Sequence, residues 1–89
     1  MQHLNIHIYG IVQGVGFRYA IKQQARLMGI NGFVRNEPDG SVYMEAEGDD
    51  SALAEFVLWC RKGPAYARVE DVKIENESLK YYTSFDARH

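Results

Sequence analysis

The run GIVQGVGFR at residues 10–18 contains three glycines and ends in an arginine. Before it, apolar and polar residues alternate with the period of two that is typical of a half-buried strand. The apolar positions are Leu4, Ile6, Ile8 and Val12. After it, apolar residues recur at helical spacing as far as Gly29, which is suited to end a helix in a left-handed conformation. The run therefore predicts a loop that connects a strand to the first turn of a helix.

Two strands and a second helix are predicted next. The stretches INGFVRN and SVYMEAEG have strand patterns, and EPDG between them predicts a hairpin turn, because Pro38 presets the backbone and Gly40 accepts a positive φ. In DDSALAEFVLWCRKG the apolar residues fall at the i, i+3, i+4, i+7 spacing of an amphipathic helix, which Gly63 and Pro64 end. YARVEDVKIE then predicts a fourth strand, and YYTSFDA predicts a short fifth strand at a sheet edge.

The order of these elements, βαββαβ with an additional C-terminal edge strand, predicts a ferredoxin-like two-layer sandwich of the α+β class. We expect an antiparallel sheet with two helices on one face. A chain of 89 residues is one domain, residues 1–89, and is too small for an enzyme with a cleft between domains. Any active site must therefore lie on a surface loop.

Composition excludes several classes of partner. A net charge of −2 supplies no basic field for nucleic acid and no polybasic stretch for a membrane. The N-terminus lacks the features of a signal peptide and no apolar run approaches the length of a membrane span, so we expect a cytoplasmic protein, and a monomer. The single cysteine, Cys60, falls on the apolar face of the second helix and is expected to be a core residue rather than a nucleophile.

Residues 13–18, called the glycine loop below, lack the hallmarks of three familiar sites. A Walker A loop would end in Gly-Lys-Ser/Thr, a dinucleotide fingerprint would have glycine at Tyr19, and a metal chaperone would carry Cys-x-x-Cys. Backbone N–H groups ahead of a helix N-terminus favour anions, and the fork of Arg18 matches two phosphate oxygens. The loop therefore predicts a site at which inorganic phosphate or sulfate competes with substrate. The alternative is a tight turn in which Arg18 pairs with a carboxylate.

The glycine loop also resembles the cradle of cysteine-dependent phosphatases, in which a cysteine lies six positions before the arginine. That position is Val12 in this chain. A phosphate cradle without a nucleophile cannot form a phosphoenzyme by that route.

Three stretches, GIVQGVGFR, GFVRNEPDGSV and GPAYARVEDV, resemble the motifs of the acylphosphatases, and the likeness covers nearly the whole chain. It implies hydrolysis of the carboxyl-phosphate bond of a small-molecule acyl phosphate, with no metal and no organic cofactor. The resemblance gives Asn36 the role of orienting the attacking water and Arg18 that of binding phosphate. It places the rest of the phosphate cradle at Gln13, Gly14, Val15, Gly16 and Phe17.

The residue chemistry is compatible with these roles. The Asn36 amide can hold a water by hydrogen bonds but cannot remove its proton at neutral pH. The first two stretches, GIVQGVGFR and GFVRNEPDGSV, contain no histidine, and His3 and His7 are expected on the solvent face of the first strand. An acyl phosphate needs no acid catalyst, because its leaving carboxylate has a conjugate acid with a pKa of about 4. Catalysis then reduces to positioning and to electrostatic stabilisation of the phosphoryl group.

Two departures from the family pattern and two alternative functions remain. Glu37 follows Asn36, and a carboxylate facing the site would repel a dianion; the terminal FDARH predicts a short last strand.

Phe33 and Tyr43 could form a base-stacking platform, as in RNA-recognition modules of similar topology. Domains of this fold also handle carbamoyl phosphate within larger maturation enzymes, although the length and self-contained ends of this chain favour a free-standing enzyme.

Overall fold

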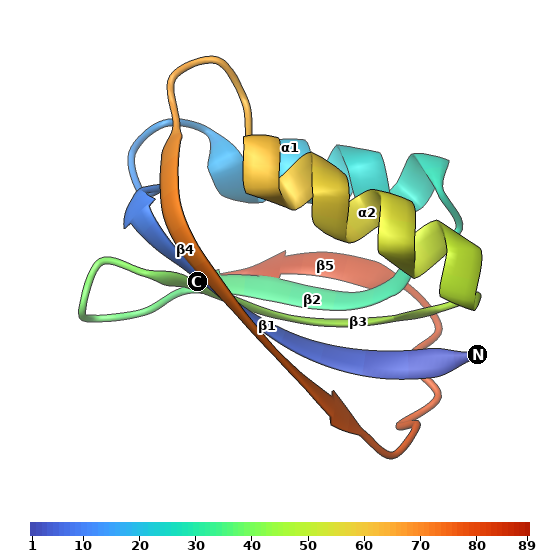
Figure 1. Cartoon of the computed structure of the whole chain (residues 1–89). Helices are drawn as coiled ribbons and strands as arrows, with labels where there is room; N and C mark the ends of the chain where they lie inside the picture. Colours follow the sequence, from blue (N-terminus) through green and yellow to red (C-terminus); the bar gives the residue numbers. More distant parts are fainter.

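The computed structural model describes all 89 residues, and its five strands form one mixed sheet with both helices on the same face (Figure 1). The elements in chain order are β1 (Gln2–Ile11), α1 (Phe17–Leu27), β2 (Asn31–Asn36), β3 (Val42–Gly48), α2 (Asp50–Lys62), β4 (Arg68–Glu77) and β5 (Phe85–Arg88). Across the sheet the strand order is β4-β1-β3-β2-β5. The predicted ferredoxin-like α+β sandwich is confirmed. Neither helix is both long enough and apolar enough to cross a membrane.

The core lies between the sheet and the two helices, and it is filled by the apolar positions of the sequence pattern. In β1 the alternation directs Leu4, Ile6 and Ile8 toward the helices. The helices contribute Phe17, Ile21, Ala25, Leu53, Phe56 and Cys60. Burial raises the pKa of the Cys60 thiol well above its ordinary value, so this cysteine is a protonated core residue at neutral pH. Met28, at the C-terminus of α1, is half-buried against this core.

The sheet departs from the predicted antiparallel arrangement at one pairing, because β5 runs parallel to β2. β1 and β2 run in the same direction, since both are antiparallel to β3, and β4 ends opposite His3 near the start of β1. The connection from β4 therefore reaches the far edge beside the start of β2, at Gly32. The connection from β4 to β5 is too short to reach the end of the sheet at which β2 finishes. β5 therefore begins beside the start of β2 and runs parallel to it.

Residues 78–84, the crossing segment, pass across the sheet face opposite the helices (Figure 1). Glu47 accepts hydrogen bonds from the backbone N–H groups of Lys80 and Tyr82. Glu45 accepts from the Tyr82 hydroxyl at 2.7 Å and lies 3.0 Å from the Lys80 ammonium. These residues occupy part of the stretch predicted as the fifth strand, which is why β5 begins only at Phe85.

The prediction that His3 lies on a solvent-exposed face is wrong, because His3 is only 1% exposed. Its side chain points to the predicted face of β1, but the crossing segment covers that end of the sheet. The ring is bonded through Nδ1 to Glu47 Oε2 at 2.7 Å and through Nε2 to Asn5 Oδ1 at 2.7 Å. His7, further along β1, remains partly exposed as expected.

Candidate active site

The glycine loop turns the chain from β1 into α1 through two residues with left-handed backbone conformations. Gly14 has a φ of 73° and Gly16, the residue before the helix, has a φ of 76°. Side chains are disfavoured at such angles, so glycine is the residue that permits this turn. The backbone N–H groups of residues 13–16 donate to no backbone carbonyl, and the first turn of a helix leaves further N–H groups unpaired. The loop therefore offers several free donors next to a helix N-terminus.

A cavity of about 200 Å³ lies where the glycine loop, α1 and the end of β2 meet. It is lined by Val12, Gln13, Gly14, Gly16, Phe17, Arg18, Tyr19 and Asn36. The structure thus brings together all the site residues named from the sequence except Val15, which is half-buried against the core. Sequence reasoning missed Val12 and Tyr19 as lining residues, and their position beside the loop was the available signal.

Arg18 is the one charged residue that lines the cavity. Its Nη1 donates to the backbone carbonyl of Arg88 in β5 at 2.6 Å, and its side chain forms no ion pair with a carboxylate. The alternative in which Arg18 pairs with a carboxylate is therefore not what the structure contains. A guanidinium carries five N–H donors, so one bond to a carbonyl leaves donors for an anion.

Asn36, the last residue of β2, presents a buried carbonyl oxygen that has no hydrogen-bond partner in the protein. Leaving a buried acceptor unpaired costs about 1–3 kcal/mol, and such groups call for an explanation such as a bound donor. Asn36 also lines the cavity, so its side-chain amide lies close to any water molecule held there.

Glu37 does not line the cavity. Its carboxylate lies 3.3 Å from Nη2 of Arg35 and 4.0 Å from Nε2 of His7. Since side chains alternate along β2, these contacts hold Glu37 on the sheet face opposite the helices, away from Asn36. The expected repulsion of a dianion by an inward-facing Glu37 therefore does not arise.

The predicted alternative of a base-stacking platform is disfavoured by the cover over both rings. Phe33 is 4% exposed, and the guanidinium of Arg88 lies 3.9 Å from its ring centroid. The guanidinium of Arg35 lies 4.8 Å from the centroid of Tyr43. The ring faces that nucleobases would need are thus in contact with arginine side chains.

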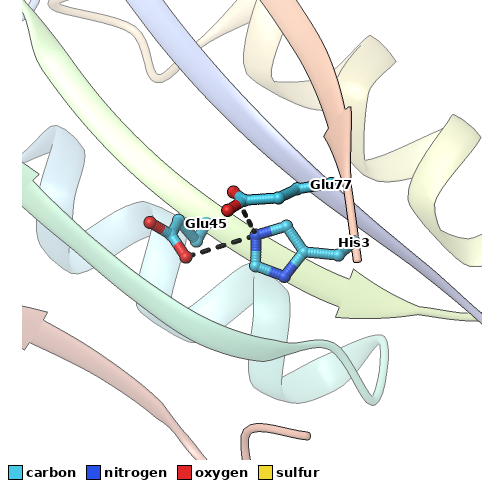
Figure 2. A group of neighbouring side chains, drawn as sticks. All are labelled: His3, Glu45 and Glu77. Carbon is cyan, nitrogen blue, oxygen red and sulfur yellow. Dashed lines mark ion pairs between the residues drawn. The ribbon is translucent and has the colours of Figure 1, made fainter. Parts of the chain in front are cut away.

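His3, Glu45 and Glu77 form a second cluster of ionisable groups, at the opposite end of β1 from the cavity (Figure 2). His3 Nε2 lies 3.2 Å from Glu45 Oε1 and 3.7 Å from Glu77 Oε2. Such residues can ligate a metal, but these groups already have partners. Lys80 Nζ lies 3.0 Å from Glu45 and 3.6 Å from Glu77, and Asn5 donates to Glu77. The cluster therefore anchors the crossing segment.

Titration of Glu45 is expected to reduce stability in acid. Burial by itself raises the pKa of Glu45, but hydrogen bonds from two hydroxyls and an ammonium group outweigh burial and lower its pKa from 4.5 to about 2. The donors are Tyr43, Tyr82 and Lys80. Because the folded-state pKa is depressed, this stabilisation is complete above pH 4.5 and is lost as the pH falls toward 2.

The loss is expected to be on the order of 2 kcal/mol after allowance for solvent screening. Urea unfolding of the wild type and of Glu45→Gln across this pH range measures it, and the variant should show a shallower dependence on pH. The same slope in both proteins would mean that other carboxylates are responsible.

Comparison with known proteins shows the family of this chain. A family model described as acylphosphatase matches residues 4–87. An acylphosphatase of Thermotoga maritima is 43% identical over 89 residues, covering 100% of this chain and 99% of that protein. The crystal structure of the acylphosphatase from Bacillus subtilis is similar with a TM-score of 0.97 at 34% identity, and 100% of both chains is covered.

A further solved structure that is similar is part of a much larger protein, full-length HypF in a phosphate- and nucleotide-bound form. The likeness has a TM-score of 0.88 at 26% identity and covers 99% of this chain but 12% of that one. Family model, relatives over the full length and solved structures therefore agree, and the chain belongs to the acylphosphatase family.

Proposed function

We propose that this acylphosphatase acts by direct attack of a water molecule, oriented by Asn36, on a phosphoryl group held by Arg18 and the glycine loop. Family membership supports the coarser statement that the protein hydrolyses acyl phosphates. The finer statement rests on one observation: Asn36, whose Oδ1 has no partner in the protein, lines the same cavity as Arg18 and the glycine loop with its unpaired N–H groups. The cavity thus combines donors for an anion with an acceptor for its attacker.

The chemistry follows from what these groups can and cannot do. The guanidinium and the N–H groups neutralise charge on the phosphoryl oxygens, and they stabilise it further as the transition state forms. The water oxygen bonds to phosphorus while the bond from phosphorus to the acyl oxygen breaks, and that oxygen keeps the electron pair as a carboxylate. The products are a carboxylate and inorganic phosphate, which retains both protons of the water as H₂PO₄⁻. The carboxylate leaves unprotonated, so no general acid is required.

Turnover is expected to continue in the presence of a chelator. The reason is that neither GIVQGVGFR nor GFVRNEPDGSV contains a cluster of metal-ligating residues. The test is hydrolysis of benzoyl phosphate by the purified protein with and without EDTA, with inorganic phosphate or sulfate titrated as a competitor. We expect equal rates with and without chelator, and competitive inhibition by both anions. Loss of turnover in EDTA that a divalent ion restores would refute the mechanism.

The same assay with carbamoyl phosphate tests the alternative role, in which a domain of this fold handles carbamoyl phosphate within a larger maturation enzyme. A site that contacts only the phosphoryl group should accept both substrates, and their relative kcat/KM then reports contacts to the acyl group. Turnover of carbamoyl phosphate alone would favour the role in a maturation enzyme.

A further inference from the structure

We propose that Gln13 is a positioning residue that fixes Asn36 relative to the glycine loop. The role rests on the proposed function, because it matters only if Asn36 orients the attacking water. Both hydrogens of the Gln13 side-chain nitrogen are donated to backbone carbonyls of the β2–β3 hairpin. Nε2 lies 2.8 Å from the oxygen of Glu37 and 2.8 Å from the oxygen of Ser41. The side chain thus bonds to the hairpin, although the residue borders the cavity.

The strand register explains why such a connection is needed. β1 pairs with β3 only as far as Ile8 opposite Val42. The register of β1 then shifts between Tyr9 and Gly10, and the strand continues beside β4 to the pair of Ile11 with Arg68. β1 therefore separates from β3 before the chain reaches the cavity, and no ladder of backbone hydrogen bonds joins the glycine loop to the β2–β3 hairpin.

The two carbonyls that Gln13 binds lie at the base of the hairpin turn. Glu37 N donates to Ser41 O at 2.9 Å, which closes the turn, and Gln13 donates both to that same oxygen and to the backbone oxygen of Glu37. Glu37 follows Asn36 directly in the chain. A contact to the Glu37 carbonyl therefore restrains the residue that follows Asn36.

Asn36 depends on its backbone for placement, because its buried Oδ1 has no protein partner that would hold the side chain. A shift of the hairpin relative to the glycine loop would move the attacking water relative to the phosphoryl group. A misplacement of about 1 Å can lower a rate by about 10²-fold, whereas the loop would still bind phosphate. Gln13 should therefore affect the rate of chemistry more than phosphate affinity.

The test is the variant Gln13→Met, which keeps the length of the side chain but donates no hydrogen bond. We expect kcat to fall by about 10-fold to 10²-fold, while the inhibition constant of inorganic phosphate changes by less than about threefold. In an Asn36→Ala background the same substitution should change kcat by less than about threefold, because the group that it positions is already missing. Gln13→Asn, which keeps the donors on a shorter side chain, should show the same pattern with a smaller loss.

Asn31→Ala is the matched control, since Asn31 at the other end of β2 also donates from its amide to a distant backbone carbonyl, that of Tyr82, at 3.1 Å. It should lower thermal stability without lowering kcat. Three results would overturn the proposal: equal losses in both backgrounds, parallel loss of phosphate affinity, or unchanged kcat in folded Gln13→Met and Gln13→Asn. If instead Asn36→Ala itself retains normal kcat, it is the water-orienting role of Asn36 that fails.

Discussion

Replacing Arg18 by Gln is expected to abolish both turnover of an acyl phosphate and competition by inorganic phosphate. Arg18 is the one charged residue that lines the cavity, so the variant removes the only positive charge in the lining of the proposed phosphate site. Glutamine also cannot form the two parallel charge-assisted bonds of a guanidinium. Arginines that stabilise phosphoryl transfer are worth about 10³–10⁵ in rate, and we expect kcat/KM to fall by that order.

Stability should hardly change in Arg18→Gln. The side chain is partly exposed and its one hydrogen bond within the protein is that to the Arg88 carbonyl, so only a small loss is expected. Arg26→Gln is the matched control. Arg26 also lies on α1 and donates to a carbonyl of β5, that of Phe85, at 3.3 Å, but it does not line the cavity.

We would measure steady-state kinetics, phosphate binding by calorimetry and thermal unfolding for both variants. Together these measurements distinguish a role of Arg18 in phosphate binding from a role in attaching β5 to α1. We expect Arg26→Gln to retain both activity and phosphate binding. A folded Arg18→Gln protein with near-normal turnover would mean that Arg18 serves only to attach β5 to α1.

Replacing Asn36 by Ala is expected to lower kcat by about 10²–10³, or about 3–4 kcal/mol, with little change in phosphate affinity. The reason is that, in the proposed mechanism, the lost group contacts the attacking water rather than the phosphoryl oxygens. An interaction made mainly in the transition state lowers kcat without a matching change in binding. Because Oδ1 has no protein partner, its removal should not lower the free energy of unfolding.

Thermal stability, phosphate binding and kcat are therefore to be measured on one preparation of Asn36→Ala. The competing explanation is that Asn36 only caps the turn before Pro38. It predicts lower stability with normal turnover of the folded fraction. If phosphate binding weakens in parallel with kcat, Asn36 is part of the phosphate cradle and the division of roles is wrong.

Local signals in the sequence were sufficient to predict the strands, loop and helix that position the site. The alternation in β1, the glycines before α1 and the turn residues of the hairpin act within a few residues, and their physical causes are steric and local. They predicted the strand, loop and helix that carry Arg18. The motifs likewise pointed to Asn36, which the structure places in the same cavity.

Long-range features were not predictable in this way. The parallel pairing of β5 depends on where β4 ends relative to β2, and His3 is buried because a segment about 80 residues later in the chain crosses its face. The sequence pattern around His3 is that of an exposed residue, since alternation specifies a face and not what covers it.

The sequence by itself thus determined the order of the elements, the apolar face of each and the turn of the glycine loop, because these follow from local backbone preference and periodicity. Only the tertiary structure decided which groups are bonded to one another across the chain. The bond from Arg18 to the Arg88 carbonyl, the two bonds from Gln13 to the hairpin and the unpartnered oxygen of Asn36 all depend on the packing of distant segments. Such contacts are set by the relative placement of strands, which no local pattern encodes.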